Sequence, residues 1–238
     1  MMGGVRRMRR GAGRCVMLGA ALGLAACVSV GKPGAAVPLF DGTSLTGWTM
    51  VDGRPPDPRT WRAQDGLIAQ VSRERPLGDL MTDRCYTDFD LSLEWRLEKG
   101  GNSGIIYRVA PRADAPAWHS GIEFSLLDDA NYPSAAGKPK QHSGAAFDLF
   151  APAADAERPA GQFNLARIRV VGGYAEQWLN GVEVVRFKIG AAGWRRALAA
   201  SKFVGFPKFG EAECGHIVLQ NHGDPVQFRN LRIVDLSR

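Results

Sequence analysis

The sequence predicts an all-β fold in which two antiparallel sheets pack as a jelly-roll sandwich. Three observations predict it. Several short segments alternate apolar and polar residues with a period of two, the pattern of half-buried strands. Asx-Gly pairs at 65–66 and 180–181 favour tight type I′ hairpin turns. Only about residues 193–200 favour a helix, so the chain lacks the helical crossovers that a parallel sheet requires.

The first predicted strands flank the pair at 65–66 and form a hairpin between Trp61 and Ile68. Residues 89–97 (FDLSLEWRL) alternate throughout, with five apolar side chains on one face and four polar ones on the other. Residues 121–127 and 166–171 show the same alternation over shorter spans. Each segment is therefore predicted to bury one face and expose the other.

The remaining strands complete the sandwich. Residues 174–187 form a predicted hairpin around Asn180-Gly181. Residues 226–236 alternate with one slip at Arg229-Asn230, which predicts a β-bulge. The apolar halves of these strands would fill a core between the two sheets.

Residues 1–26 have the pattern of a secretory signal peptide. They carry five arginines and no acidic residue, and their apolar run 15–26 is too short to span a bilayer. The run ends in Leu24-Ala25-Ala26-Cys27, which resembles a bacterial lipobox. Cys27 is therefore predicted to be acylated and to become the new N-terminus. An ordinary signal peptide, cleaved nearby, is the alternative.

The rest of the chain is predicted to be one tethered domain. The lipidated Cys27 and the small residues that follow it form a flexible tether over 27–37, and the domain spans 38–238. These predictions describe an exported lipoprotein that is anchored in a membrane, in the periplasm or at the outer membrane.

The charge of the chain lies mainly in this leader. The formal net charge is +6, and removing the five leader arginines would leave +1. A nearly neutral domain lacks the electrostatic basis for binding nucleic acid.

Cys85 and Cys214 are the cysteines of the predicted domain. An exported protein folds in an oxidising compartment, so the two could form a disulfide. Two buried free thiols are the alternative, because a sequence contains no distance between them.

Three charged residues point away from the predicted core: Glu94, Arg108 and Glu123. On an ordinary outer face they would be solvated. On the concave outer face of a curved jelly roll they would converge on a groove of the kind that binds hydroxyl-rich ligands. Alternation alone leaves both interpretations open.

Six segments in a fixed order resemble the 3-keto-disaccharide hydrolase domain family, over about residues 39–236. They are LFDGTSLTGW (39–48), FDLSLEWR with GGNSGIIYR (89–108), GIEFSLLDD (121–129), HSGAAFDL (142–149), LNG (179–181) and GHIVLQNHGDPVQFRNLRIVDL (215–236). The resemblance implies a jelly roll of the concanavalin A-like lectin/glucanase type.

The resemblance also implies a reaction on oxidised sugars. A ketone at C3 of a glycoside acidifies the hydrogen on C2. A base can remove that proton, after which the C1 substituent leaves and water adds to the product. The reaction needs a base near C2, a proton source for the leaving oxygen, and a positive or hydrogen-bonding group for the enolate.

Glu123 and His222 are the predicted catalytic residues. Glu123 lies mid-strand between apolar neighbours, where partial burial would raise its pKa and suit it as the base. An ion pair with a neighbouring Arg is the alternative. His222 is predicted to be the acid or a second base, because imidazole exchanges protons near neutral pH. A hydrogen bond within its own loop is the alternative.

The other candidates are predicted to bind substrate. The glycines at 100, 101 and 104 are expected to permit a tight turn, placing Asn102 at the rim of the groove; an Asx turn is the alternative. Arg108 is expected to meet the ketone or enolate oxygen, unless it pairs with Glu94 or Glu123. The full set of predicted substrate-binding residues is Glu94, Asn102, Arg108, Asp128, His142 and Gln220. Asp128, Asp129 and Gln220 rank lower, and a structural role in its loop is the alternative for His142.

The sequence departs from the family pattern at two places and lacks several other patterns. Ser125 stands where a Gln is expected, and Phe163-Asn164 where Trp-Asn is expected. The paired acids of jelly-roll glucanases, phosphate loops, nucleophile elbows and CxxC or HExxH motifs are missing. No cofactor is predicted with certainty. A divalent cation such as Ca²⁺, held by Asp128, Asp129 or Glu94, stays possible.

Three functions therefore compete. The leading one is an enzyme that acts on 3-keto glycosides, for which a separate oxidoreductase must supply the ketone. The second is a non-catalytic carbohydrate-binding module of the same fold. The third is a structural lipoprotein of the cell envelope, which predicts that polar groups do not converge on a groove.

Overall fold

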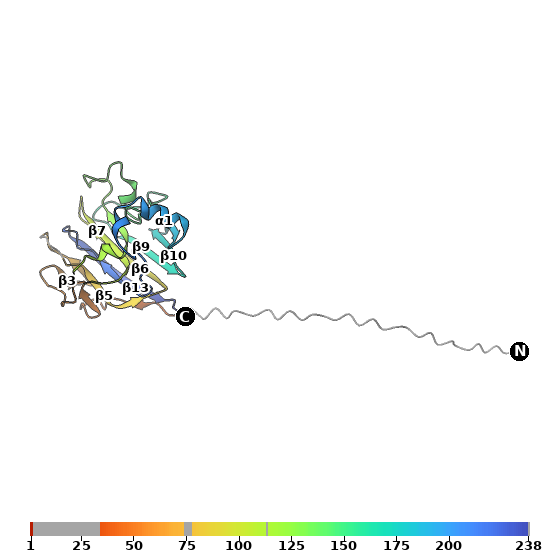
Figure 1. The fold of residues 1–238 in the computed structure, drawn as a ribbon. Coiled ribbons are helices and arrows are strands. Elements are labelled where there is room, and N and C mark those ends of the chain that lie inside the picture. Colours follow the sequence, from red (N-terminus) through yellow and green to blue (C-terminus); the bar gives the residue numbers. More distant parts are fainter. Residues whose placement is uncertain (2–33, 74–77, 113, 238) are drawn as a thin grey trace. The chain divides into compact units, whose positions relative to one another are not determined.

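The computed structural model describes residues 1, 34–73, 78–112 and 114–237, and it confirms the all-β class (Figure 1). Its strands form two sheets in which every pairing is antiparallel over the described residues. The predicted signal peptide and the lipidation site Cys27 lie outside the described residues. Within those residues, helices are too short or too polar to cross a membrane.

The larger sheet has eight strands. In order across it lie β11 (Val182–Lys188), β10 (Tyr174–Leu179), β9 (Asn164–Val171), β6 (Phe89–Leu97), β13 (Val226–Asp235), β4 (Leu67–Gln70) and β3 (Trp61–Gln64), and β1 (Val37–Pro38) pairs with β13.

The smaller sheet has five strands. In order across it lie β2 (Trp48–Met50), β5 (Leu80–Tyr86), β12 (Gly215–Leu219), β7 (Asn102–Val109) and β8 (Ile122–Leu127). Short helical segments connect the strands: η1 (Ala117–His119), η2 (Pro139–Gln141), α1 (Ala192–Ala199) and η3 (Lys202–Gly205). The predicted helix at about 193–200 is therefore present as α1.

The core lies between the sheets, as the alternation predicts. Burial along β6 alternates without a break, and its five apolar side chains are at most 3% exposed. The facing residues of the smaller sheet include Ile105, Tyr107, Ile122 and Phe124, all fully buried. Trp194 of α1 closes one side of this core.

The predicted turns and bulge are also present. Asp65 and Asn180, the first residues of the two Asx-Gly turns, adopt the left-handed backbone that type I′ turns need, with φ of 53° and 50°. The pairing of β13 with β6 shifts register between Arg229 and Arg232, and Asn230 has a φ of 54°. The extra residue of the predicted β-bulge lies within this interval.

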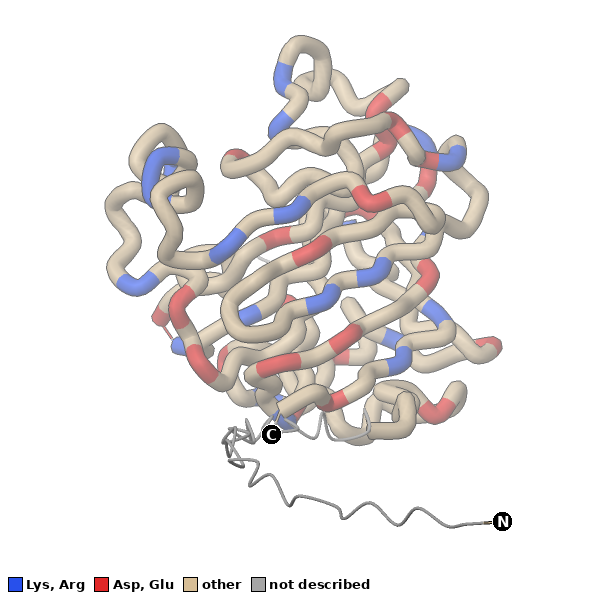
Figure 2. The backbone as a smooth tube through the Cα atoms, turned by 90° about the vertical axis from the view of Figure 1, so that its right-hand side faces the viewer, with Lys and Arg blue, Asp and Glu red and all other residues tan. Residues whose placement is uncertain are grey.

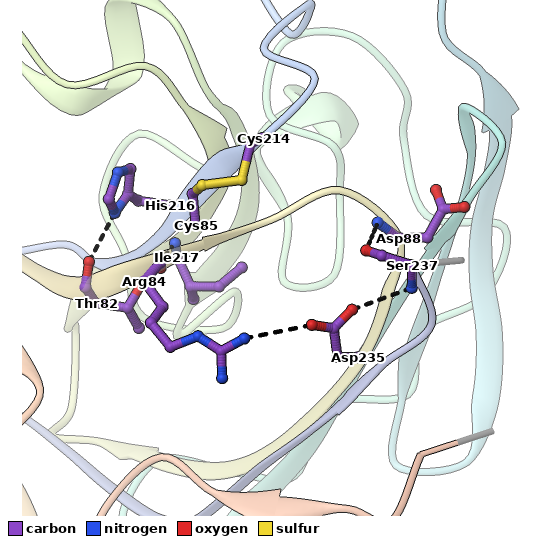
Figure 3. Close-up of a disulfide and its surroundings, with 9 residues drawn as sticks. All are labelled: Thr82, Arg84, Cys85, Asp88, Cys214, His216, Ile217, Asp235 and Ser237. Carbon is purple, nitrogen blue, oxygen red and sulfur yellow. Dashed lines mark hydrogen bonds and ion pairs between the residues drawn. A yellow bond between two sulfur atoms is a disulfide. The ribbon is translucent and has the colours of Figure 1, made fainter.

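Cys85 and Cys214 form a disulfide, with their Cα atoms 5.2 Å apart (Figure 3). The bond joins β5 to the residue just before β12, next to the point where Cys85 pairs with His216. The cysteines are 129 positions apart in the chain, so the bond removes much freedom from the unfolded state. Disulfides of this kind typically stabilise a small domain by about 2–5 kcal/mol.

The outer faces of the two sheets differ in what covers them. Acidic and basic residues are interspersed over the strands that face the viewer in Figure 2. On the outer face of the larger sheet such residues pair across strands, for example Arg167 with Asp90 at 2.5 Å. The outer face of the smaller sheet instead carries a second apolar cluster, which includes Ile106, Val218 and Ala117 of η1. Connecting segments therefore cover the smaller sheet and exclude water from it.

Candidate active site

Strand pairing places a row of polar residues on the outer face of the smaller sheet. Gly104 of β7 pairs with Ser125 of β8, and the Gln220 N–H donates to the Gly104 carbonyl at 2.9 Å. Leu219 of β12 pairs with Leu80 of β5, so the next position brings Asp79 opposite Gln220. Three segments far apart in sequence thus contribute to one row.

A cavity of about 470 Å³ opens over this row. Such a volume lies within the range of small-molecule sites. The cavity is lined by Asp79, Asn102, Pro116, Trp118, Glu123, Tyr132, Ser134, Gln141, Phe147, Lys202, Gln220, Asn221 and His222. A structural lipoprotein was expected to lack a groove on which polar groups converge, and the polar lining of this cavity contradicts that expectation.

Gly104 forms the floor beneath Glu123. A Cβ atom at position 104 would lie 2.8 Å from Cγ of Glu123 and 3.2 Å from Oε1 of Gln220. Gly104 does not have a positive φ, so here glycine is needed for space. The expectation that Gly104 serves a tight turn is therefore wrong: it lies inside β7.

Glu123 is 6% exposed although it lies on an outer face. Burial raises its pKa to about 7, against the Lys202 charge and the Gln220 hydrogen bond, while the Asp79 charge adds to the rise. Nε2 of Gln220 donates to Oε2 of Glu123 at 3.3 Å. Among the described residues no Arg forms an ion pair with it. The alternative of an Arg-paired carboxylate is therefore not what is found.

Gln220 offers an unused acceptor beside the carboxylate. It is 8% exposed, and its Oε1 has no hydrogen-bond partner among the described residues. A buried acceptor of this kind is costly unless a partner arrives. A hydroxyl group of a bound ligand would satisfy it.

Asp79 is a second carboxyl group in the same cavity, and it is half-buried. Burial raises its pKa to about 7, and the hydrogen bond from the Asn221 N–H to Oδ1, at 2.9 Å, opposes the rise. Glu123 and Asp79 are therefore each partly protonated near neutral pH, whereas exposed carboxyl groups are fully ionised there.

Lys202 supplies the positive charge of the cavity. Its Nζ lies 4.3 Å from the ring centroid of Phe147 and 4.7 Å from that of Trp118. Aromatic faces hold an ammonium group without neutralising it. Among the described residues, Lys202 has no carboxylate oxygen within 4.0 Å.

Asn102 and His222 lie together in this cavity. Nδ2 of Asn102 is 3.5 Å from Nε2 of His222, and Nδ1 of His222 is 3.6 Å from Oδ2 of Asp224. His222 thus contacts its own loop, as the alternative expected, and also lines the cavity. Four predicted site residues therefore converge: Asn102, Glu123, Gln220 and His222.

Glu94 does not join them. It lies in β6 of the larger sheet, where Oε2 accepts from Arg229 at 2.7 Å and Oε1 from Asn230 at 2.7 Å. Partial burial would raise its pKa, but these hydrogen bonds and the Arg229 charge bring the pKa below its usual value. The prediction that Glu94 binds substrate is corrected, because it lies on the wrong sheet.

Arg108 is also turned away from the cavity. Its φ is 58°, at a point where the pairing of β12 with β7 shifts register. This irregularity breaks the alternation from which its direction was predicted, and Nε donates to the Gly210 carbonyl at 2.7 Å. Neither carboxylate proposed as its partner lies within 4.0 Å of it among the described residues. Lys202 provides the cation that Arg108 was expected to supply.

Asp128 and His142 line a different cavity of about 640 Å³, which also contains Asp129 and Glu157. Asp128 accepts from the Gly100 N–H at 2.7 Å, and Nε2 of His142 lies 3.1 Å from the Ala135 carbonyl. Asp128 thus supports the turn at Gly100 and His142 supports its own loop, so neither lies in the cavity beside Glu123.

The residues named for a divalent cation do not assemble a site. Glu94 lies on the larger sheet, apart from Asp128 and Asp129. In the described part of the chain, no group of three or more His, Cys, Asp or Glu side chains could hold a metal ion. The suggested Ca²⁺ stays a prediction from the sequence.

A larger cavity of about 680 Å³ lies on the other sheet, between β4, β13 and β6. Arg73 pairs there with Glu98 at 2.5 Å, and Nε of Arg96 donates to Oε1 of the neutral Gln227 at 2.9 Å. The smaller cavity over Gly104 combines two acids of raised pKa with a cation that lacks a carboxylate partner among the described residues, and it is therefore the candidate active site.

Sequence reasoning missed Asp79 and Lys202. Asp79 stands directly before β5 and two positions before Met81, which points to the outer face of the sheet. The period of two along a strand could therefore have predicted that Asp79 also points outward. Lys202 begins the short helical segment η3, which has too few residues for a periodic pattern to indicate direction. Its place depends on the fold alone.

Comparisons with known proteins agree with this architecture. Residues 35–234 match the model of the 3-keto-α-glucoside-1,2-lyase-like domain. The chain is 30% identical over 224 residues to a 3-keto-disaccharide hydrolase of Bacteroides thetaiotaomicron, covering 83% of this chain and 77% of that protein.

Solved structures show the same fold. A candidate glycosyl hydrolase from Parabacteroides distasonis is 30% identical and superposes with a TM-score of 0.78, covering 86% of this chain and 94% of that one. A non-specific endo-β-1,3(4)-glucanase of family GH16 is 11% identical with a TM-score of 0.52, over 85% and 94% of the two chains. The latter likeness concerns the fold alone, and it confirms the predicted jelly-roll type.

Proposed function

We propose that this chain, which belongs to the 3-keto-α-glucoside-1,2-lyase-like domain family, cleaves glycosides whose sugar carries a ketone at C3. The reaction removes the proton on C2, eliminates the C1 substituent and adds water to the unsaturated product. The observation that carries the proposal is the single cavity over Gly104 in which a buried carboxyl group, a half-buried one and one cation meet.

Glu123 would be the base that removes the C2 proton. A carboxylate with a pKa of about 7 is a stronger base than an exposed one and is still partly ionised at neutral pH. Gln220 holds its Oε2 and so orients the carboxylate. Gly104 leaves the space that this orientation needs.

Lys202 would stabilise the enolate. Negative charge develops on the C3 oxygen as the C2 proton leaves, and a fixed cation in a partly closed cavity lowers the energy of that state. The aromatic rings of Phe147 and Trp118 hold the ammonium group in place.

Asn102, Gln220 and His222 would position the sugar. Their amide and imidazole groups line the cavity and can bond hydroxyl groups, which the unused Oε1 of Gln220 requires. Placing the reacting atoms in this way contributes to the rate beyond the chemistry of the base.

The test compares a 3-keto glucoside that bears a chromogenic aglycone with the parent glucoside. The wild-type chain is expected to release the aglycone from the keto sugar only, and Glu123→Gln is expected to lose that release. Release from the parent glucoside, or from neither compound, contradicts the proposal. Binding without release would instead favour a carbohydrate-binding module. The polar groups of the cavity could bind sugar hydroxyl groups in that case too.

The proposal implies further partners. A separate sugar oxidoreductase must introduce the ketone, because the reaction starts from an already oxidised sugar. Membrane anchoring through Cys27, and export to the periplasm or outer membrane, remain predictions from the sequence.

A further inference from the structure

A second cavity adjoins the candidate active site. It measures about 280 Å³ and is lined by Val51, Asp52, Gly78, Asp79, Arg112, Asp114, Ala115 and Pro116. Two of these residues, Asp79 and Pro116, also line the cavity that contains Glu123. The two cavities therefore share a boundary formed by Asp79 and Pro116.

We propose that Asp79 is the catalytic acid that protonates the leaving oxygen, with the keto sugar bound in the first cavity and the leaving group in the second. This inference rests on the proposed function. The bond that breaks joins the two parts of the substrate, so it must cross the boundary between the cavities. Of the two residues at that boundary, only Asp79 can carry a transferable proton.

The surroundings of Asp79 suit the role. The Asn221 N–H holds Oδ1 at 2.9 Å, which fixes the orientation of the carboxyl group. Burial raises the pKa of Asp79 to about 7, so the group still carries a proton near neutral pH. Gln220 lies between Asp79 and Glu123 across the strands, and so separates the acid from the base.

The proton balance closes over the two half-reactions. In the elimination Glu123 takes the C2 proton, the C1–O bond breaks, and the leaving oxygen takes the proton of Asp79. In the hydration Asp79 takes a proton from water as the hydroxide adds to C1, and Glu123 returns its proton to C2. Both acids regain their starting states, without any further reactant.

The second cavity also indicates the class of leaving group. Asp52, Arg112 and Asp114 bring charged side chains to it. Arg112 pairs with Asp114 at 2.9 Å and Asp52 with Arg54 at 2.6 Å, and the described lining contains no aromatic residue. Charged and polar groups bind hydroxyl groups better than apolar rings. The leaving group is therefore expected to be a hydroxyl-rich unit such as a second sugar.

The test uses the leaving group as a variable. The full chain, Asp79→Asn, His222→Gln and Glu123→Gln are assayed on 3-keto glucosides that release either 4-nitrophenol or glucose. 4-Nitrophenol leaves as the phenolate and needs no proton, whereas the glucose oxygen must be protonated to leave. Asp79→Asn is expected to lose about 10²–10³-fold on glucose release and less than about 10-fold on 4-nitrophenol release. Glu123→Gln is expected to lose both.

Each outcome decides the assignment. Equal losses on both substrates in Asp79→Asn, or no loss on either, overturn the role of Asp79. A loss selective for glucose release in His222→Gln but not in Asp79→Asn overturns it in favour of His222. Exchange of the C2 hydrogen in D₂O provides a second readout: Asp79→Asn should retain it, and Glu123→Gln should not. A wild-type chain that releases neither product contradicts the proposed function itself, which separates the two failures.

Discussion

Glu94 and Glu123 occupy equivalent places in the sequence pattern and opposite environments in the molecule. Each lies mid-strand, on the polar side of an alternating segment. Glu94, on the larger sheet, is ion-paired with Arg229 and its side chain is 26% exposed. Glu123, on the smaller sheet, is 6% exposed and has Gln220 as its nearest hydrogen-bond partner.

The contrast shows that the cover over a strand decides the chemistry of its side chains. The same residue type has a pKa below its usual value on the open sheet, and a pKa of about 7 under the loops of the covered sheet. An outer face becomes a candidate active site when connecting segments exclude water from it. Four predictions test this difference.

The largest expected effect is on activity. Glu123→Gln should lower kcat/KM on a 3-keto glucoside by about 10²–10⁴-fold, because the general base is lost. Glu94→Gln, the matched change on the other sheet, should stay within about 2-fold of the wild type. Comparable losses in the two variants would remove the functional distinction between the sheets.

The second effect is on stability, and it has opposite signs on the two sheets. The folded pKa of Glu123 is raised from 4.5 to about 7, so folding binds a proton within this window and stability falls as the pH rises through it. Glu123→Gln should therefore be as stable relative to the wild type at pH 4 as the loss of the side-chain contacts allows. At pH 8 its unfolding free energy relative to the wild type should be higher than at pH 4 by up to about 3 kcal/mol. Some decline with pH should remain in this variant, because Asp79 titrates in the same range.

Glu94 should show the reverse. Its folded pKa is lowered, so its contribution is present above the unfolded pKa and is lost as the pH falls through the folded one. Glu94→Gln should therefore lose stability at neutral pH and not at low pH. Urea unfolding of both variants across this range measures the two signs, and equal signs would contradict the assigned environments.

The third effect concerns the floor of the covered face. Gly104→Ala should lower activity by about 10-fold or more, because the new Cβ displaces the Glu123 side chain. Gly193→Ala is the matched control, since a Cβ at that position in α1 meets no atom within 4 Å. The control should keep full activity and gain up to about 1 kcal/mol of stability. A fully active Gly104→Ala protein would show that the close packing of Glu123 against position 104 is not needed for activity.

The smallest effect is expected from the ion pair on the open sheet. A double-mutant cycle of Glu94→Gln and Arg229→Gln should give a coupling energy below about 1 kcal/mol, which salt reduces further. A coupling of several kcal/mol, unaffected by salt, would mean that this face is as dry as the other.

The sequence by itself determined much of the architecture. Period-two alternation in residues 89–97 determined which side chains enter the core, since successive side chains of a strand point to opposite faces. Asn180-Gly181 determined a hairpin turn because these residues tolerate a left-handed backbone. The family resemblance indicated the jelly-roll type and drew attention to Glu123. These features depend on neighbours in the chain, or on a pattern that the whole family shares.

Only the tertiary structure decided which residues meet. Strand pairing brought Asp79 beside Gln220, although the two are far apart in sequence. A left-handed residue in an irregular strand pairing turned Arg108 out of phase, and the folded chain placed Lys202 in the cavity instead. The loops that cover one sheet buried Glu123 and left Glu94 to an exposed ion pair. Alternation is local, whereas burial and charge contacts depend on segments that pack from elsewhere in the chain, so no local pattern could distinguish the two carboxylates.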